Sequence, residues 1–310
     1  MDKKVITIGN TPLSYSIYSA ESTETTMHDR GVLEIIFCLK GSVRFAYAYE
    51  EFTLNAEEFV SVDRDAYYLY KGKDNILVSF CINLLKYEDK YPNIRNNLFV
   101  CEGTSESTMK YPTRWYNKLK GLMISALKQI SRGAETDSIQ KISDSIVDLF
   151  VNHFDINFFH TKTEELQPEV IERVREITNY MSLHCKDRII LRDLAEHLNL
   201  TEGYTSEFMR KYSISFRKML AYIRANESEW YLMNTNKTVV EISEECGFSD
   251  PQYYYSAFKQ WYRCTPRQFR ECYCKDIEND IEYLSIESIQ NLLDEILTDH
   301  YLENFTTDLN

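Results

Sequence analysis

The clearest functional pattern in this 310-residue chain lies at residues 239–262. The segment opens with an apolar helical stripe formed by Val239, Ile242 and Cys246. Gly247 then supplies a turn, Asp250 is a good N-cap residue, and Pro251 takes the first helical turn, where its missing N–H costs nothing. This order predicts a helix-turn-helix unit, whose second helix can enter the major groove of DNA.

Residues 189–212 have the same organisation. The apolar stripe of the first helix is made by Leu191, Leu194, Ala195 and Leu198. A short turn follows at residues 199–200, and Thr201 is placed to cap a second helix. A helix through 216–233 would join the two units, so that two recognition helices could face successive major grooves.

The letters EISEECGFSDPQYYYSAFKQWYRCTPRQFR, at residues 241–270, resemble the signature of the AraC/XylS family of bacterial transcription regulators. The residues in register with it are Ile242, Gly247, Phe248, Ser249, Asp250, Pro251, Tyr253, Phe258, Lys259, Pro266, Phe269 and Arg270. The connecting helix keeps Arg224 and Leu232 of the pattern. This resemblance implies a C-terminal all-α DNA-binding domain over residues 168–275, with helix-turn-helix units at 189–212 and 239–262.

The first unit departs from the family pattern. Thr205 stands where an apolar residue is usual, and the glycine after the recognition helix is missing, which leaves the segment RKYSISF one residue short. In the second unit, Ser243 replaces the usual alanine, which is a mild change. We therefore expect the second unit to dominate DNA contact.

The resemblance also implies six base-facing positions. They fall on Gln252, Tyr255 and Ser256 in the second unit and on Gly203, Ser206 and Glu207 in the first. Gln252 can form a bidentate pair with adenine, Ser256 can donate or accept at any base edge, and Tyr255 offers its ring to a thymine methyl. Gly203 has no side chain, and Glu207 accepts only from cytosine while repelling phosphate.

Four basic residues lie one turn further along these helices: Arg210, Lys211, Lys259 and Arg263. Side chains of this kind bind phosphates and fix the position of a protein on the duplex. The alternative for each is an ordinary solvated helix face. The neighbouring aromatic residues are expected to be core residues rather than contacts, and they are Tyr253, Tyr254, Phe258 and Trp261.

Residues 5–82 alternate between core-forming and other side chains with the period of two that is typical of strands. Turns are expected at residues 40–42 and 71–75, which predicts a small barrel or sandwich. The segments MHDRGVLEIIFCLKG and FTLNAEEFVSVDRDAYYLY resemble the two cupin motifs. They imply a cupin-like sensor barrel over residues 1–112.

Metal-binding cupins supply two or three His and a Glu from these motifs. Here His28 and Glu34 match, but Arg30 and Tyr68 occupy the other His positions. One remaining His gives too few nitrogen ligands, so neither a metal nor another cofactor is expected.

Other side chains that could bind a ligand give weaker signals. Arg44 and Arg64 could meet a carboxylate in the barrel, or could equally be surface residues. Cys264, Cys272 and Cys274 lack the two-residue spacing of zinc ligands, so plain thiols are expected there. The sequence also lacks the common nucleotide-binding and catalytic motifs, and no catalytic residue is predicted.

From Thr113 onwards the apolar period becomes helical. A seam at 3-4-3-4 spacing is formed by Ile139, Ile142, Ile146, Leu149 and His153. Such a seam predicts a dimerisation and linker region at 113–160, and packing onto the chain's own barrel is the equal alternative. A polar linker at 161–167 ends this region.

The charge of −13 is unevenly distributed. Residues 168–275 carry 16 Lys and Arg against 15 Asp and Glu, which gives +1, whereas residues 276–310 carry ten acids and no base. A duplex binder needs basic side chains on one face rather than a basic total. An amphipathic helix with acids around Ile286, Ile289, Leu293, Ile296 and Tyr301 is expected in the tail, docked on the DNA-binding domain or competing with phosphate for its cations.

These features predict an α+β protein of two domains that acts as a DNA-binding transcription regulator and not as an enzyme. No apolar run approaches the ~18 residues of a membrane helix, and no export segment is recognised, so a cytoplasmic location on the bacterial nucleoid is expected. The expected partners are double-stranded DNA, a second copy of the chain, a small-molecule effector and, for an activator, RNA polymerase. Two alternatives are a metal-dependent cupin enzyme fused to a DNA anchor and a DNA-binding-impaired protein that titrates other regulators.

Overall fold

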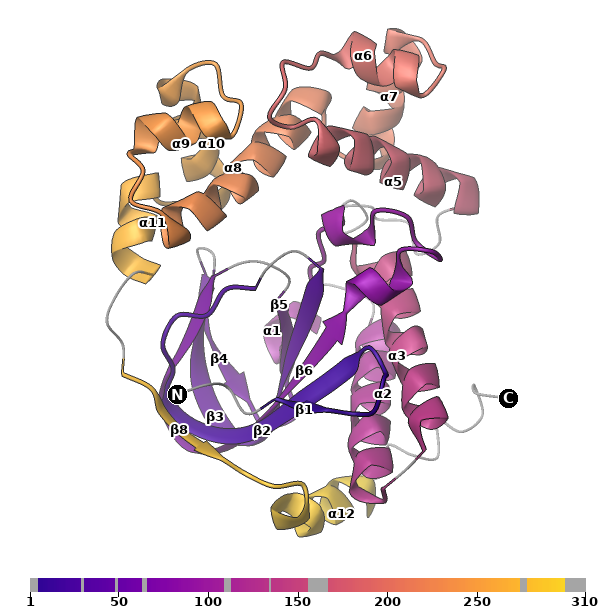
Figure 1. Ribbon diagram of the computed structural model, residues 1–310, viewed down its shortest axis with the longest axis vertical. Helices are drawn as coiled ribbons and strands as arrows, with labels where there is room; N and C mark the ends of the chain where they lie inside the picture. Colours follow the sequence, from indigo (N-terminus) through magenta and orange to yellow (C-terminus); the bar gives the residue numbers. More distant parts are fainter. Residues whose placement is uncertain are drawn as a thin grey trace.

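The structure is a computed structural model. It describes residues 5–28, 31–47, 50–62, 66–108, 113–133, 135–155, 167–273 and 278–298. A sheet-rich N-terminal part and a helical C-terminal part lie one above the other in Figure 1, which confirms an α+β, two-domain organisation. Among the described helices, none is long and apolar enough to cross a membrane.

The described residues form an eight-stranded antiparallel sheet that curves around a core. Its strands are β1 (Ile6–Thr7), β2 (Leu13–Ser22), β3 (Val32–Tyr47), β4 (Glu50–Asn55), β5 (Phe59–Val62), β6 (Tyr67–Asn83), β7 (Glu102–Gly103) and β8 (Asp280–Tyr283). The order of neighbours is β1-β2-β6-β3-β5-β7, while β4 pairs with β3 and β8 pairs with β2. Short helical turns surround the sheet: η1 (Leu84–Tyr87), η2 (Ile94–Asn96) and α1 (Ser105–Thr108).

β3 and β6 pair with each other over nearly their whole length. Their register shifts around Gly41, whose φ is +70° and where a Cβ would lie 2.2 Å from the Asp74 carbonyl oxygen. The turns predicted at 40–42 and 71–75 are therefore wrong, because both segments are irregular stretches inside continuous strands. Glycine and positive-φ residues mark bulges as well as turns, and a single sequence does not separate the two.

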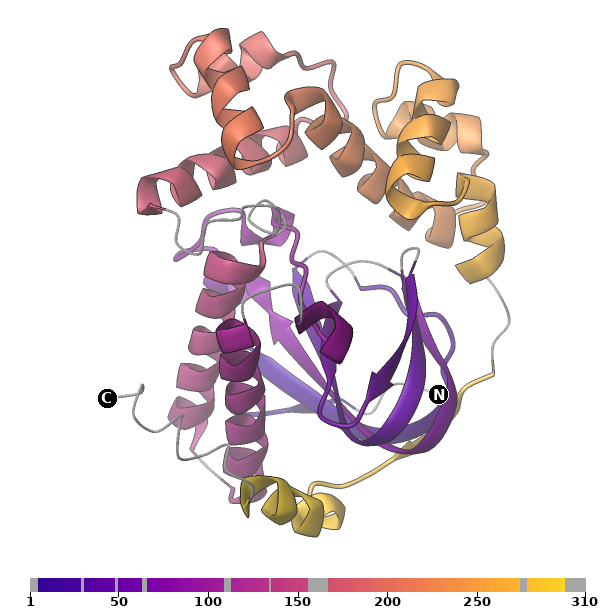
Figure 2. The same cartoon turned by 180° about the vertical axis from the view of Figure 1, so that it is seen from behind.

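Alternate residues of β3 face opposite sides of the sheet. Leu33, Ile35 and Phe37 belong to the large core that includes α2 (Thr113–Ser131) and α3 (Thr136–Leu149). Ile36 and Cys38 join the separate core enclosed by the curved sheet. Figure 2 shows α2 and α3 side by side against one flank of the sheet, as Figure 1 does from the other side.

The seam of α3 is buried inside the chain. Ile139 and Ile146 are completely buried, and Ile142 is 8% exposed. His153 lies in η3 (Phe150–Phe154) and stacks on Trp115, with 3.6 Å between ring centroids. The seam thus packs on the chain's own sheet, and its buried side chains do not form the predicted dimer contact, because α2 and the sheet already cover them.

The C-terminal domain contains seven described helices: α5 (Pro168–Leu183), α6 (Leu191–His197), α7 (Glu202–Tyr212), α8 (Phe216–Asn234), α9 (Val239–Glu245), α10 (Pro251–Tyr262) and α11 (Pro266–Tyr273). α8 connects two sub-cores, one around α5, α6 and α7 and one around α9, α10 and α11. Each sub-core holds one predicted helix-turn-helix pair. The linker predicted at 161–167 lies outside the described residues except for Gln167.

The tail returns to the sheet domain. After β8 come η4 (Glu287–Ile289) and α12 (Gln290–Thr298), and Ile286, Ile289 and Leu293 are buried in the core shared with α2 and α3. Figures 1 and 2 show α12 at the end of the molecule opposite the helical domain. The expectation that the tail is one helix docked on the DNA-binding domain is therefore wrong for the described residues. The apolar face was correctly recognised, but its partner is distant in sequence; Tyr301 lies outside the described residues.

Candidate nucleic-acid interface

Polar side chains fix the starts of the helices in both units. Thr201 accepts a hydrogen bond from the Tyr204 N–H at 3.3 Å, and Asp250 accepts one from the Gln252 N–H at 2.8 Å. Such caps satisfy backbone donors that a helix leaves unpaired. The first turn of each recognition helix is thus held in place, as the sequence predicted.

The second recognition helix, α10, separates its buried and exposed faces cleanly. Tyr254 and Phe258 are fully buried, and the Tyr254 hydroxyl donates to Ser228 Oγ of α8 at 2.9 Å. The predicted base-facing residues are all on the exposed side, namely Gln252, Tyr255 and Ser256. Packing against α8 therefore leaves these three side chains free of the core, on a rigid helix.

Lys259 and Arg263 are also exposed, and Arg263 ends α10 with a left-handed φ of 53°. Of the aromatic residues expected to be core, Tyr253 is 45% exposed and Trp261 is half-buried. The expectation was thus correct for Tyr254 and Phe258 and wrong for Tyr253, because the helix turns that ring outward.

The first recognition helix, α7, presents a different surface. Gly203, Ser206 and Glu207 are exposed, as are the cations Arg210 and Lys211. Glu202 is exposed as well, so two carboxylates occupy this face. The helix therefore offers acids where the second helix offers amide and hydroxyl groups.

Thr205 shows how a polar residue fills an apolar position in α7. The residue is fully buried, and its hydroxyl donates to the Thr201 carbonyl at 3.0 Å. A threonine hydroxyl that bonds one turn back satisfies its own polarity within the helix. The departure from the family pattern thus leaves the local fold intact.

Two arginines tie distant helices together. Arg224 of α8 is 9% exposed and donates to the carbonyls of Cys185 and Asp187, at 2.6 and 2.8 Å. Arg270 of α11 donates to the carbonyls of Leu232 and Thr235 at the end of α8, at 2.9 and 3.2 Å. Cations suit helix C-termini, where carbonyls lack partners. These family-pattern residues are therefore structural.

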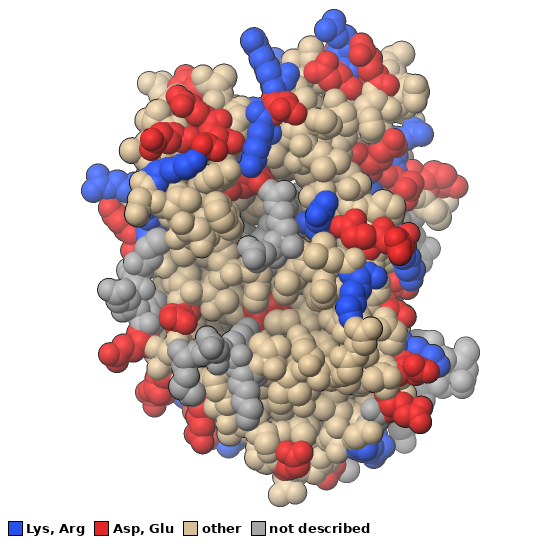
Figure 3. All heavy atoms as spheres, in the orientation of Figure 1, with Lys and Arg blue, Asp and Glu red and all other residues tan. Residues whose placement is uncertain are grey.

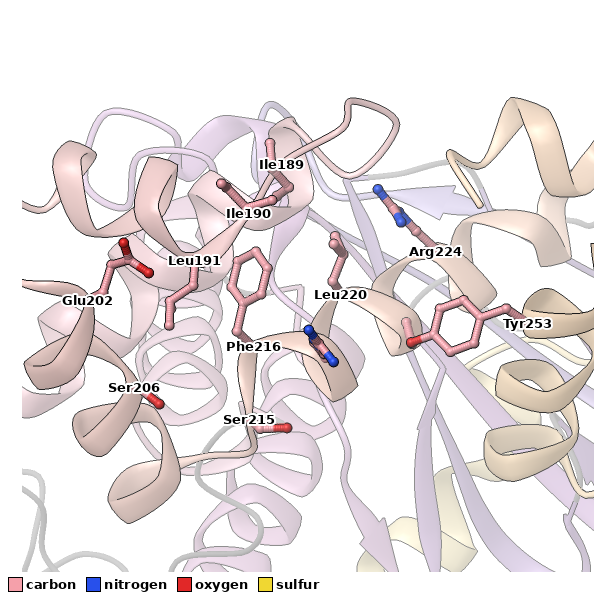
Figure 4. A pocket seen from close by; sticks show the side chains of 12 residues that line it. Ile189, Ile190, Leu191, Glu202, Ser206, Ser215, Phe216, Leu220, Arg224 and Tyr253 are labelled. Carbon is pink, nitrogen blue, oxygen red and sulfur yellow. The ribbon is translucent and has the colours of Figure 1, made fainter. Parts of the chain in front are cut away.

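A groove of about 760 Å³ separates the two units. Figure 4 shows Phe216 and Leu220 between Glu202 of α7 on one side and Tyr253 of α10 on the other. Arg217, at the start of α8, also lines this groove and is exposed. Sequence reasoning missed Arg217, although a basic residue in the first turn of the connecting helix was a usable signal.

The helical domain carries mixed charges rather than one basic field. Figure 3 shows Lys and Arg interspersed with Asp and Glu over the domain. A hydrogen bond with the Tyr212 hydroxyl raises the pKa of Lys211, so this side chain stays a cation. Affinity for a polyanion would therefore depend on a few placed cations rather than on the total charge.

The sheet encloses a buried carboxylate, Glu34, near the predicted metal motif. Its Oε2 lies 2.6 Å from His28 Nε2 and accepts a hydrogen bond from the Tyr67 hydroxyl at 2.6 Å. Ligand atoms of His28, Glu34 and Cys81 all lie within 4.8 Å of one another. The Tyr68 hydroxyl instead lies 3.9 Å from Cys272 Sγ of α11, so it cannot join this group.

This donor set does not fit the cupin metal site, which uses several His. The sequence did not single out Cys81, and Arg30 and Arg64 lie outside the described residues. Arg44 points to β4, where it donates to Thr53 Oγ1 at 3.2 Å. Among the three cysteines considered for zinc, Cys274 lies outside the described residues. The absence of a metal stays a prediction.

Comparison with known proteins gives one family match in the C-terminal part and longer matches to individual relatives. Residues 194–271 match the helix-turn-helix domain family. An uncharacterized helix-turn-helix-type transcriptional regulator of Staphylococcus aureus is 22% identical over 247 residues, covering 77% of this chain and 31% of the relative. The regulator YdiP of Escherichia coli is 21% identical over 263 residues, covering 80% and 82%. The Msm operon regulatory protein of Streptococcus mutans is 32% identical over 91 residues, covering 29% and 31%.

Two solved structures are also similar in part. ToxT from Vibrio cholerae has 12% identity and a TM-score of 0.43, with 85% of this chain and 98% of that chain covered. The C-terminal domain of the response regulator yesN from Fusobacterium nucleatum has 32% identity and a TM-score of 0.30, covering 32% and 98%. The chain thus spans about a third of the staphylococcal relative and most of YdiP. The C-terminal part of this chain, residues 194–271, thus carries a helix-turn-helix domain of the AraC type.

Proposed function

We propose that the protein is a sequence-specific DNA-binding transcription regulator whose N-terminal sheet domain senses a small molecule. The observation that carries this proposal is the pair of capped helices, α7 and α10, with exposed outer faces on either side of one connecting helix. Two helices held in this way can read two turns of a duplex.

Base reading is assigned mainly to α10. Gln252 would pair with adenine, while Ser256 and Tyr255 would contact neighbouring base edges. The first unit would make fewer base contacts through α7, where the base-facing residues are Gly203, Ser206 and Glu207. The phosphate contacts are assigned to Arg210, Lys211, Lys259 and Arg263, and Arg217 in the intervening groove extends this set.

The sensor is proposed to be a cupin-like barrel over residues 1–112, followed by helical residues 113–160. Direct contacts offer a route from sensor to DNA-binding domain. The buried carboxylate of Glu229, in α8, accepts hydrogen bonds from the Ala66 N–H at 2.5 Å and from the Tyr262 hydroxyl at 2.7 Å. A ligand that moves the backbone near Ala66 would thereby change how the second unit packs on the sheet domain.

The first unit contacts the N-terminal domain at a separate place, through α5. Arg175 of α5 donates to the Val151 carbonyl at 2.8 Å and to Asn152 Oδ1 at 3.1 Å. The two units thus contact the N-terminal domain at separate places. These contacts support the proposal that the N-terminal domain sets the position of one unit relative to the other. The proposed cellular setting is the bacterial cytoplasm, with RNA polymerase as a further partner for an activator and a homodimer formed by a surface other than the α3 seam.

A mobility-shift titration on the DNA upstream of the protein's own gene, followed by footprinting, tests this function. Specific retardation that survives competitor DNA is expected, with protection over two successive major grooves. Retardation that random DNA abolishes equally would contradict the proposal.

A second candidate is a protein that titrates other regulators without binding DNA itself. The acids Glu202 and Glu207 on α7 favour it, because they repel phosphate. In that case the footprint would be absent while mixed complexes with other regulators form. A metal-dependent enzyme fused to a DNA anchor is separated from both by elemental analysis, since it requires a bound metal.

A further inference from the structure

The tail strand β8 closes a small cavity at the edge of the curved sheet. The cavity measures about 70 Å³ and lies between β2, the start of β6 and β8. Its tail-derived lining consists of Asn279, Ile281 and Tyr283. At roughly 10–15 Å³ of such volume per water-sized group, it has room for about five non-hydrogen atoms. From the sequence, this tail was expected to lie on the DNA-binding domain and not on the sheet domain.

Tight pairing holds the tail in this position. Tyr283 of β8 stands opposite Tyr18 of β2, and Ser22 donates to the Glu278 carbonyl at 2.8 Å. Asn279 Oδ1 accepts a hydrogen bond from the Glu24 N–H at 2.7 Å. The cavity wall is therefore built from strand pairing rather than from a loosely placed end.

The cavity has aromatic walls. Tyr18, Tyr67 and Tyr283 all line it, and the rings of Tyr18 and Tyr283 lie 6.2 Å apart at an angle of 57°. Tyr67 stacks on Phe45 on the inner side, with 5.4 Å between centroids. Aromatic rings gathered around a small space are the walls that ammonium groups favour, because ring faces carry negative charge density.

The charged groups around the cavity are acidic. Glu24 lines it, and no Lys or Arg does so among the residues that the structure describes. The fully buried Glu34 carboxylate lies at the hydroxyl end of Tyr67 and accepts the hydrogen bond of that hydroxyl. Burial first, and the charge of Glu34 second, raise the pKa of Tyr18 and Tyr67 well above the usual value, so both rings stay neutral. An anionic ligand would be repelled here.

We propose that this cavity binds a small organic cation, an ammonium compound of about five non-hydrogen atoms, held by the three tyrosine rings and by Glu24. The ligand would touch β2, β6 and β8 at once, and so would fasten the tail to the sheet. Because β8 follows α11 in the chain, occupancy of the cavity would act on the DNA-binding domain from its C-terminal side. This inference deepens the proposed sensor role and depends on it only for that last step.

Calorimetric titration of the full chain with tetramethylammonium chloride tests the site directly, at constant ionic strength set with sodium chloride. A saturable heat in about the millimolar range is expected, given the few atoms of the ligand. Tert-butanol, which has the same number of non-hydrogen atoms and no charge, should give no saturable heat. Absence of saturation with tetramethylammonium, or equal binding of tert-butanol, would overturn the proposal.

Two variants and one matched control assign the site. Glu24→Gln should weaken binding about two- to fivefold, as expected for a solvent-exposed charge. Tyr283→Leu should weaken it about three- to tenfold through loss of a ring. Glu282→Gln lies on the same strand but is exposed outside the cavity lining, and should bind like the wild type. Wild-type affinity in both cavity variants would refute the assignment, and Glu24→Gln keeps the test valid if Tyr283→Leu misfolds.

The titration contains no DNA, so it is independent of the proposed regulator function. Binding of tetramethylammonium without specific DNA binding would support the cation site and refute the regulator function. Specific DNA binding without a saturable heat from tetramethylammonium would support the regulator function and refute the cation site.

Discussion

The two helix-turn-helix units share one construction and differ in chemistry. Each has a capped second helix with a buried inner face, yet α10 turns Gln252 and Ser256 outward where α7 turns Gly203 and Glu207 outward. Burial constrains the inner face of a helix, whereas the outer face is free to change without loss of fold. A unit can therefore keep the helix-turn-helix structure and lose much of its capacity to read bases.

The units also differ in what they pack against. The core of the second unit is continuous with sheet residues Ala46, Ala66 and Tyr68, and the ring of Tyr68 lies 5.6 Å from that of Tyr273. The core of the first unit, by contrast, comprises residues of the helical domain, and its link to the sheet domain runs through polar contacts of α5. The unit proposed to read bases is thus the one joined to the sheet domain by apolar packing.

The largest effect is expected from breaking the tie between α8 and the first unit. Arg224→Met would leave the carbonyls of Cys185 and Asp187 without their donors, and should lower the free energy of unfolding by about 2–4 kcal/mol. Urea denaturation measures this loss. Arg267→Met is the control, because Arg267 is exposed and its ion pair with Glu271 is worth at most about 1 kcal/mol. Equal losses in both variants would show that Arg224 does not hold the units together.

The sequence predicted the helical domain well because its signals are local. Caps such as Thr201 and Asp250, and stripes of period 3.6, determine where helices begin and which face is buried. The family resemblance, in turn, named exposed residues of α7 and α10 correctly at its six base-facing positions, whereas Tyr253 was wrongly expected to be buried. Arg217 was missed because its value depends on a groove between two units, which no single helix pattern contains.

The sheet and the tail were predicted less well because their partners are distant in sequence. An apolar stripe shows that a face is buried but not what covers it. The sequence of the α3 seam therefore fitted a dimer contact as well as it fitted packing on the chain's own sheet, which the structure shows. Residues 280–283 alternate polar and apolar side chains, but over only four positions, and they form a strand by pairing with β2, which is distant in the sequence. The group of Glu34, His28 and Cys81 likewise needs three strands or loops to converge.

The comparison of the units is tested most directly at the bases. Gln252→Ala should cost about 1–3 kcal/mol of DNA binding and relax the preference at one base pair. The counterpart of Gln252 in the first unit is Gly203, which has no side chain to remove, so Ser206 is the residue to change there. Ser206→Ala should cost less than about 1 kcal/mol, because a single hydroxyl makes fewer base contacts. Binding to a library of sites measures both.

Lys259→Ala serves as the phosphate control for that experiment. It should weaken all sequences alike and reduce the salt dependence by about one counterion. If Gln252→Ala also weakened every sequence equally, its base-reading role would be refuted, and a larger loss from Ser206→Ala would reverse the ranking of the two units.

Low pH should weaken the contact between the first unit and the N-terminal domain. Burial, then the charges of Arg114 and Lys118, lower the pKa of His153 to about 4. Since the folded state holds this His neutral, stability is complete above about pH 6.5 and is lost as the pH falls toward 4. We expect a loss of about 1–2 kcal/mol across that window, discounted for partial exposure.

His153→Gln removes this titration and is the test of its cause. Unfolding free energies at pH 7.5 and pH 4.5 should differ less in the variant than in the wild type. The acceptors of Arg175 lie at Val151 and Asn152, next to His153, so hydrogen exchange in α5 should rise with acid before that in α10 does. An unchanged pH profile in the variant would exclude His153 as the source.

The smallest expected effect comes from neutralising one acid on α7. Glu207→Gln removes a carboxylate from the DNA-facing side and should tighten DNA binding by about 0.2–1 kcal/mol, similarly for all sequences, because an exposed charge acts mainly through screened Coulomb repulsion. Glu196→Gln changes an exposed acid of α6 in the same way; it is the control and should change DNA binding little. Affinity measured against salt discriminates the causes, since relief of repulsion fades as salt rises. A gain confined to one sequence and persistent at high salt would instead mean that the new amide reads a base, and that the first unit is a reader silenced by a single residue.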